Sequence, residues 1–210
     1  MKVENLRIAV QSSGRLKDAT LVYLKSLGLK FDGVNSRKLI STCENKPIEI
    51  VYVRHRDIVQ LVETGVVDYG VVGANILLEL GSDVEQVVKL NFAKCSLVIA
   101  VPKNSPMKTF KDLEGMRVAT SYPNSLKKFL DDQSIKAIIV QLRGSIEVAI
   151  ALNLAEAICD ITQTGKTLWE NGLAVIGEVF SSQAVLIKSP ATKYKNNLLT
   201  NNYYEKILLQ

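Results

Sequence analysis

Short apolar runs alternate with amphipathic segments along most of the chain, and this alternation is the strongest constraint on its fold. In the first half, strands are expected at residues 6–10, 48–53 and 69–72, and helices at 16–27 and 58–64. Gly28 ends the first expected helix, and Asp57 is expected to cap the second. Strands that are each followed by a helix favour an α/β fold built on parallel strands.

The second half repeats the alternation after two longer runs, residues 84–90 and 97–101, which we expect to carry the chain between two lobes. Further strands are expected at 116–120, 136–140, 157–161, 173–180 and 184–187, with helices after Tyr122-Pro123-Asn124, at Gly144-Ser145 and over 193–210. The expected domains are residues 1–90 with 181–210, and residues 91–180. Two such lobes joined by paired crossings would enclose a cleft at the carboxyl ends of their strands.

The segment Ala157 to Leu168 carries the clearest chemistry. An apolar run leads to Asp160, a loop of hydroxyl side chains with Gly165 follows, and a helix then begins. Such loops bind phosphate through backbone N–H groups, hydroxyls and the helix N-terminus. Asp160 could accept hydrogen bonds from sugar hydroxyls, so the segment suggests a phosphorylated ribose. A nucleotide P-loop is excluded because its first glycine would stand at position 160, whereas a plain turn without a ligand remains the alternative.

Two further junctions between a strand and a helix, Ser13-Gly14 and Gly144-Ser145, have the same small or hydroxyl character as Thr164-Gly165. Three phosphate-competent helix starts at one cleft suggest a ligand with more than one phosphate group.

Composition narrows the classes of protein and partner. The 210 residues carry a net charge of +5, but the basic groups Arg54-His55-Arg56 and Lys127-Lys128 do not extend into a longer track. This pattern favours a polyanionic small molecule over a nucleic acid. No apolar run is long enough for a membrane span and no signal peptide is visible, so a cytoplasmic protein is expected. Three scattered cysteines and one histidine lack metal-ligand spacing, so no protein-held metal is expected.

The segment Ile8 to Leu16 resembles the opening motif of the ATP phosphoribosyltransferases, which begin histidine biosynthesis. More matches follow in family order at residues 37–40, 66–73, 119–123, 144–149 and 160–168, and then at Asn171-Gly172-Leu173. Together they span about residues 6–187. The resemblance implies a glycosyltransferase that moves phosphoribosyl from phosphoribosyl pyrophosphate to N1 of ATP and releases pyrophosphate. It also implies Mg²⁺ accompanying the phosphates.

The resemblance also implies roles for particular residues. The phosphoribosyl pyrophosphate would be held by Asp160, Thr162, Gln163, Thr164, Gly165, Lys166 and Thr167, with Asp160 on the ribose hydroxyls. Arg15 and Arg37 would neutralise charge on the leaving pyrophosphate. Candidates for the ATP side are Arg54, Asp57, Gly73, Ala74, Asn75, Tyr122 and Glu147. Apart from the resemblance, the two arginines read as solvated charges, and Glu147 as a residue that the helix dipole favours.

The sequence departs from the family pattern at three places. The opening motif usually has a lysine directly before Ser-Gly-Arg or Gly-Arg, and this chain has Ser12-Ser13. One pyrophosphate contact is then lost or supplied elsewhere, with Lys166 as a candidate. Ile150 and Asn153 stand where proline and glycine are usual.

The length resembles that of the short form of the family, which works with a separate regulatory subunit similar to histidyl-tRNA synthetase; a truncated long form stays open. A homodimer is also expected. The fold that the resemblance implies is two-lobed and similar to the type II periplasmic binding proteins, with a central cleft. Because that architecture also serves solute-binding proteins and regulators, a non-catalytic ligand-binding module is the alternative function.

Overall fold

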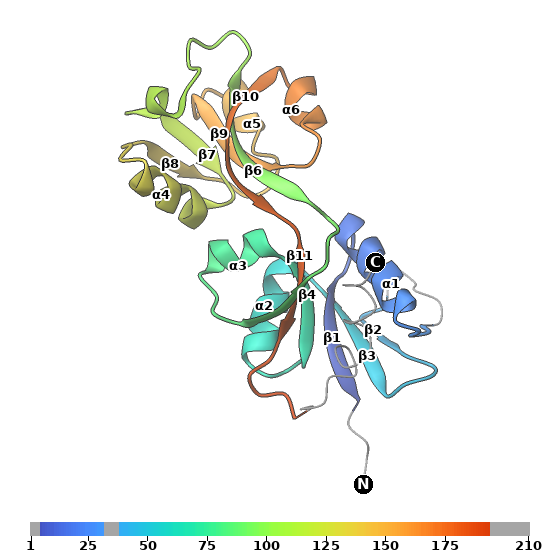
Figure 1. Cartoon of the computed structure of the whole chain (residues 1–210). Coiled ribbons are helices and arrows are strands. Elements are labelled where there is room, and N and C mark those ends of the chain that lie inside the picture. The colour runs from blue at the N-terminus through green and yellow to red at the C-terminus, as the bar shows by residue number, and fades with distance from the viewer. Residues whose placement is uncertain (1–4, 32–37, 194–210) are drawn as a thin grey trace. The chain divides into compact units, whose positions relative to one another are not determined.

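The computed structural model describes residues 5–31 and 38–193 (Figure 1). The expected site residue Arg37 lies outside these ranges, and so does the expected helix over 193–210 from residue 194 onwards. The chain divides into two compact units: the first comprises residues 1–77, 82–93 and 183–210, and the second residues 78–81 and 94–182.

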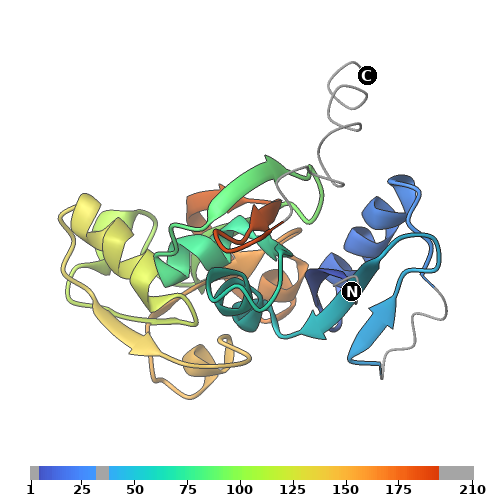
Figure 2. The ribbon, with the colours of Figure 1, turned by 90° about the horizontal axis from the view of Figure 1, so that it is seen from below.

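The first unit is built on a six-stranded mixed sheet in the order β2-β3-β1-β4-β11-β5. Its strands are β1 (Leu6–Gln11), β2 (Ile40–Thr42), β3 (Ile48–Val53), β4 (Tyr69–Gly73), β5 (Glu85–Lys89) and β11 (Ala184–Lys188). Strands β3 and β4 flank β1 and run parallel to it. The red strand β11, from the far end of the described chain, lies antiparallel between β4 and β5 (Figures 1 and 2).

The helices of the first unit are α1 (Arg15–Ser26), α2 (His55–Glu63) and α3 (Ala74–Leu80), the last residues of which group with the second unit. Helix α1 packs Leu24 into the core formed by Ile8, Ile50 and their neighbours. Helix α2 lies so close to β4 that a Cβ at Gly70 would clash with Ile58 and Val62. This contact explains why glycine occupies that position in the strand.

The expected cap of α2 is wrong. The helix begins at His55, Arg54 is its N-cap residue, and no side chain caps it. Asp57 is therefore inside the first turn, where a carboxylate still interacts favourably with the helix dipole.

The second unit is a five-stranded mixed sheet in the order β10-β6-β9-β7-β8. Its strands are β6 (Cys95–Pro102), β7 (Arg117–Thr120), β8 (Ile138–Gln141), β9 (Ala157–Thr162) and β10 (Leu173–Ser182). Strands β8 and β9 run parallel to β7, and β6 is antiparallel to both of its neighbours, β9 and β10. Alternate residues of the central strands enter two different cores, so both faces of the sheet are buried.

The helical elements of the second unit are η1 (Phe110–Leu113), α4 (Pro123–Asp132), α5 (Val148–Ala151) and α6 (Lys166–Glu170). Helix α4 contributes Leu126 and Leu130 to one core, whereas α5 and α6 contribute Ala149 and Leu168 to the other. The expected helix start at Gly144-Ser145 is wrong, because α5 begins at Val148 and Gly144 has a φ of 109° that no helix accommodates. Within the described ranges, no helix has the length and apolar character to cross a membrane.

Candidate functional site

In the first unit, the predicted site residues follow the carboxyl ends of three neighbouring parallel strands. Strands β3, β1 and β4 end at Val53, Gln11 and Gly73. The candidates that follow these ends are Arg15, Arg54, Asp57, Ala74 and Asn75, with Gly73 itself closing β4. The backbone N–H of Ser12 donates a 2.8 Å hydrogen bond to the Val53 carbonyl, which ties the loops after β1 and β3 together. This edge is where ligands bind in open α/β sheets.

Gly73 has a steric reason to be glycine. The side-chain amide oxygen of Asn75 occupies the space that a Cβ at position 73 would take. Asn75 is buried, so a side chain at position 73 would have to displace an amide that is packed inside the protein. The Gly73-Ala74-Asn75 segment is therefore a tight passage from β4 directly into α3.

Arg15 is the first residue of α1 and is exposed. Gly14 before it has a φ of 87°, which favours glycine and turns the chain from the loop into the helix. The Arg15 side chain is thus attached at the helix N-terminus, where backbone N–H groups also attract anions.

In the second unit, the remaining predicted residues meet at a corresponding edge. Strands β8, β7 and β9 run parallel and end at Gln141, Thr120 and Thr162. Tyr122 follows β7, Glu147 precedes α5, and the predicted phosphate loop, Asp160 to Thr167, spans the end of β9. Two hydrogen bonds join the three strand ends: Ser121 Oγ donates to the Leu142 carbonyl (3.0 Å) and Thr120 Oγ1 to the Cys159 carbonyl (2.7 Å).

Asp160 is electrostatically perturbed. Burial raises the pKa of its carboxyl to about 6, and the negative charge of Glu147 adds to the rise. A 2.8 Å hydrogen bond from the Ile161 N–H opposes the shift by stabilising the carboxylate. A buried carboxylate with this little compensation suits a ligand that donates hydrogen bonds, such as a sugar diol.

The phosphate loop is held in shape by its own hydroxyls. Thr162 Oγ1 accepts a 2.8 Å hydrogen bond from the Gly165 N–H, and Gly165 has a φ of 71°. No atom lies within 4 Å of the position that a Cβ on Gly165 would take, so a ligand can approach its backbone closely. Lys166 is exposed and forms an ion pair with Glu170 one helical turn later, at 3.7 Å.

Glu79 is a structural residue at this edge that the sequence pattern did not reveal. Its side chain is 2% exposed and accepts hydrogen bonds from the N–H groups of Asn124 (3.2 Å) and Ser125 (2.9 Å). A carboxylate therefore already occupies the N-terminus of α4. This helix start is closed to phosphate.

Two hollows lie on the surface of the described residues, and one of them adjoins the phosphate loop. One, of about 470 Å³, is lined by Thr164, Gly165 and Lys166 of the phosphate loop together with Lys103 and Trp169. The Lys103 ammonium lies 4.3 Å from the centre of the Trp169 ring and donates to the Trp169 carbonyl at 3.0 Å. The phosphate loop therefore borders a hollow whose lining includes the positively charged Lys103 side chain.

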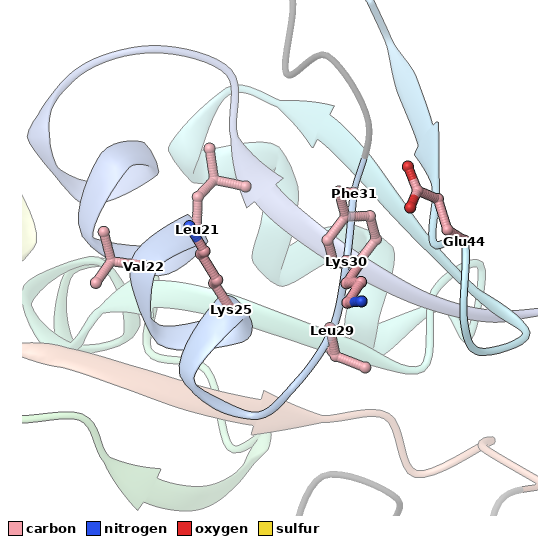
Figure 3. A pocket seen from close by; sticks show the side chains of 7 residues that line it. All are labelled: Leu21, Val22, Lys25, Leu29, Lys30, Phe31 and Glu44. Carbon is pink, nitrogen blue, oxygen red and sulfur yellow. The ribbon is translucent and has the colours of Figure 1, made fainter.

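The second hollow, of about 420 Å³, lies at the far end of α1 from Arg15. Leu21, Val22 and Lys25 project from the helix, and Leu29, Lys30, Phe31 and Glu44 complete the lining (Figure 3). It is separate from the carboxyl edge of the sheet and includes none of the predicted site residues.

Residues 54–208 match the family model described as HisG: ATP phosphoribosyltransferase. The chain belongs to the ATP phosphoribosyltransferase family. It is 43% identical over 189 residues to the ATP phosphoribosyltransferase of Maricaulis maris, covering 87% of this chain and 64% of that protein. It is 42% identical over 185 residues to that of Cytophaga hutchinsonii, covering 88% and 64%. The chain thus spans somewhat less than two thirds of the length of these curated relatives.

Solved structures of the same family, and others that share only the fold, resemble this chain. A chain of the ATP phosphoribosyl transferase (HisG:HisZ) complex from Thermotoga maritima superimposes with a TM-score of 0.75 and 28% identity, covering 97% of this chain and 94% of that one. The aliphatic sulphonate binding protein SsuA from Escherichia coli superimposes with a TM-score of 0.57 at 18% identity, covering 89% and 65%. The latter likeness concerns the fold alone and confirms a two-lobed α/β architecture similar to periplasmic binding proteins.

One departure from the pattern of ATP phosphoribosyltransferases has a local explanation. Asn153, where glycine is usual, has a φ of 56° at the end of α5. Asparagine is among the residues that tolerate this left-handed conformation best, so the turn keeps its shape. The presence of Ser12-Ser13 where the family usually has a lysine has no such local explanation.

Proposed function

We propose that this chain catalyses the ATP phosphoribosyltransferase reaction, the first step of histidine biosynthesis. Phosphoribosyl pyrophosphate and ATP are the substrates, and phosphoribosyl-ATP and pyrophosphate are the products. Family membership carries the proposal. The gathering of the predicted residues at the carboxyl edges of the two sheets supports it, because ligands of open α/β sheets bind there.

The chemistry is a displacement at C1 of the ribose. The lone pair of adenine N1 forms the new N–C bond, the C1–O bond breaks, and its electron pair leaves with pyrophosphate. Positive charge develops on the ribose and negative charge on the leaving group. The reaction therefore depends on electrostatic stabilisation more than on a strong base.

The roles of the second unit follow from the phosphate loop. The loop residues from Thr162 to Thr167 hold the 5-phosphate, because the Gly165 backbone is open to close approach. The Asp160 carboxylate accepts hydrogen bonds from the ribose hydroxyls, which compensate for its burial. Tyr122 and Glu147 are assigned to ATP.

The roles of the first unit concern the phosphates and the nucleotide. Arg15 and Arg37 neutralise the pyrophosphate as the C1–O bond breaks. Arg54, Asp57 and the segment from Gly73 to Asn75 are assigned to ATP.

Mg²⁺ is proposed as part of the substrates. Among the described residues, no group of three or more His, Cys, Asp or Glu side chains could ligate a metal ion. As the family resemblance implies, the cation is assigned to the phosphate oxygens of phosphoribosyl pyrophosphate and ATP, where it offsets their charge.

We further propose that the chain works as the short form of the family, as a dimer that associates with a regulatory subunit similar to histidyl-tRNA synthetase. The likeness to a chain of the Thermotoga maritima HisG:HisZ complex over nearly all of both chains supports this assembly. A cytoplasmic location stays a prediction from the sequence.

The alternative is a ligand-binding module without catalysis, since the fold also occurs in binding proteins. The deciding experiment mixes the protein with ATP, Mg²⁺ and phosphoribosyl pyrophosphate and follows the ultraviolet absorbance of the adduct. The Asp160→Ala variant is the matched control, because it should lose affinity for phosphoribosyl pyrophosphate. Absence of the adduct, both alone and with the regulatory subunit, would exclude the enzyme.

A further inference from the structure

Lys17 is a buried cation for which the described part of the first unit supplies no ion-pair partner. It lies in the first turn of α1 and is 7% exposed. Its Nζ lies 5.0 Å from the centre of the Tyr52 ring on β3. Among the residues that the structure describes, no carboxylate forms an ion pair with it. A buried ammonium with a cation–π contact alone is costly, because the ring replaces little of its lost hydration.

Two buried hydroxyls of the same sheet also lack hydrogen-bond partners among the residues that the structure describes. The Tyr52 hydroxyl is buried and has no hydrogen bond to a described residue, and the same is true of Ser41 Oγ on β2. Ser41 pairs directly with Ile50, two residues before Tyr52 on β3, so Ser41 and Tyr52 belong to the same face of the sheet. Buried polar groups are nearly always satisfied in folded proteins, and unpaired ones call for an explanation.

The position of the ammonium links it to the candidate site. Lys17 follows the loop of Ser12 to Gly14, and side chains of a helix point towards its N-terminus. Tyr52 is the last but one residue of β3 and is paired with Val10 of β1. The Lys17 ammonium and the Tyr52 ring therefore lie at the carboxyl edge of this sheet, close in the chain to Arg15.

We propose that Lys17 Nζ and the Tyr52 hydroxyl bind a phosphate group at the carboxyl edge of the first unit. An ammonium, a hydroxyl donor and the N-terminus of a 12-residue helix are complementary to a phosphate oxygen. The identity of this phosphate rests on the proposed function, under which it belongs to the pyrophosphate of phosphoribosyl pyrophosphate. Lys17 then supplies a cationic contact in place of the lysine that Ser12-Ser13 lacks. Lys166 is a poorer candidate because Glu170 already pairs with it.

The test measures the affinity for inorganic pyrophosphate by calorimetry in the unmodified protein, Lys17→Met and Tyr52→Phe. Lys25→Met is the matched control, since Lys25 is an exposed lysine of the same helix. Lys17→Met should weaken binding about 10- to 100-fold, as for one charge-assisted hydrogen bond, and Tyr52→Phe about 2- to 10-fold. Lys25→Met should stay within about twofold of the unmodified protein.

Thermal unfolding of the free proteins separates binding from folding. Methionine replaces a buried charge with an apolar chain of similar length, so Lys17→Met should unfold at the same or a higher temperature. Should Lys17→Met not fold, Tyr52→Phe, which removes a single unpaired oxygen, decides the question. Unchanged pyrophosphate affinity in a folded variant, or no binding by the unmodified protein, would overturn the inference.

The adduct assay on the same proteins separates this inference from the proposed function. Pyrophosphate binding that depends on Lys17, without any adduct, contradicts the enzyme and supports the site. Adduct formation that Lys17→Met leaves unchanged, in both turnover and KM, contradicts the site and supports the enzyme.

Discussion

The carboxylate of Glu79 accepts a 2.9 Å hydrogen bond from the backbone N–H of Ser125, and a second one from Asn124. Both N–H groups belong to the first turn of α4, which has no side-chain cap of its own. The Asn124 side-chain amide donates a 2.9 Å hydrogen bond to the backbone carbonyl of Glu79. A residue 45 positions away in the chain thus completes the start of this helix.

Removing this carboxylate should destabilise the protein. Glu79→Ala leaves two N–H groups of α4 without acceptors in a buried place, so the free energy of unfolding should fall by about 2–4 kcal/mol. Urea denaturation measures the change. Glu178→Ala, at an exposed position in β10, is the control and should lie within about 0.5 kcal/mol of the unmodified protein. A similar small change for Glu79→Ala would show that the cap contributes little.

Asp160 should make stability depend on pH. The folded protein keeps this carboxyl protonated up to about pH 6, whereas the unfolded chain releases the proton near the ordinary aspartate pKa of 3.8. Between these values the folded state binds more protons, so stability falls as pH rises through the window and remains lower above it. Asparagine cannot ionise, so the Asp160→Asn variant should not lose stability in this pH window.

The expected measurement is a stability difference that changes with pH. Asp160→Asn should gain roughly 2 kcal/mol relative to the unmodified protein between pH 4.5 and pH 7.5, as followed by urea denaturation. Glu178→Gln should show no such trend, because its carboxylate is exposed. A difference that is the same at both pH values would mean that Asp160 ionises normally in the folded protein.

Arg37 should act mainly on turnover. Its role is taken from the family resemblance, since it lies outside the described residues. If it meets charge that develops as pyrophosphate leaves, Arg37→Ala lowers kcat about 100-fold or more while KM for phosphoribosyl pyrophosphate changes much less. Lys38→Ala, at the exposed neighbouring position, is the control. A raised KM with intact kcat would reduce Arg37 to a substrate anchor.

Histidine should inhibit the assembly rather than this polypeptide. A polypeptide of these 210 residues is expected to retain some catalysis and to ignore millimolar histidine. Addition of the synthetase-like subunit should raise turnover and introduce inhibition, since coupling requires two distinct sites. Steady-state assays across the histidine range measure both effects. Strong inhibition of the isolated polypeptide that is not competitive with substrate would contradict the short-form proposal.

The fold was largely predictable where the apolar pattern is long and regular. The run at 48–53 alternates inward and outward side chains, and the buried run at 69–72 is followed by a glycine; both form strands. The shortest elements have no such regular apolar pattern in the sequence. Strand β2 has three residues and pairs along one side only, and α3 follows β4 without any intervening turn residues.

The candidate site was predictable to the extent that it follows from topology. Parallel strands send their following loops to one edge, so Arg54 and Arg15, or Tyr122 and Asp160, are brought together within each unit without knowledge of any side-chain contact. Contacts between distant segments carry no local signal. The cap that Glu79 provides and the burial of Lys17 against Tyr52 both depend on packing between separate elements, and neither could be predicted from spacing.

The place of β11 in the first sheet also has a consequence for synthesis on the ribosome. Strand β5 pairs with β11 and with no other described strand, yet β11 emerges about a hundred residues later. The intervening residues 94–182 hold all five strands of the second sheet, so that sheet can complete its pairing while the nascent chain still lacks the last strand of the first. Until then β5 and the β4 edge remain open, and the first unit depends on a late, long-range closure that is slow by nature.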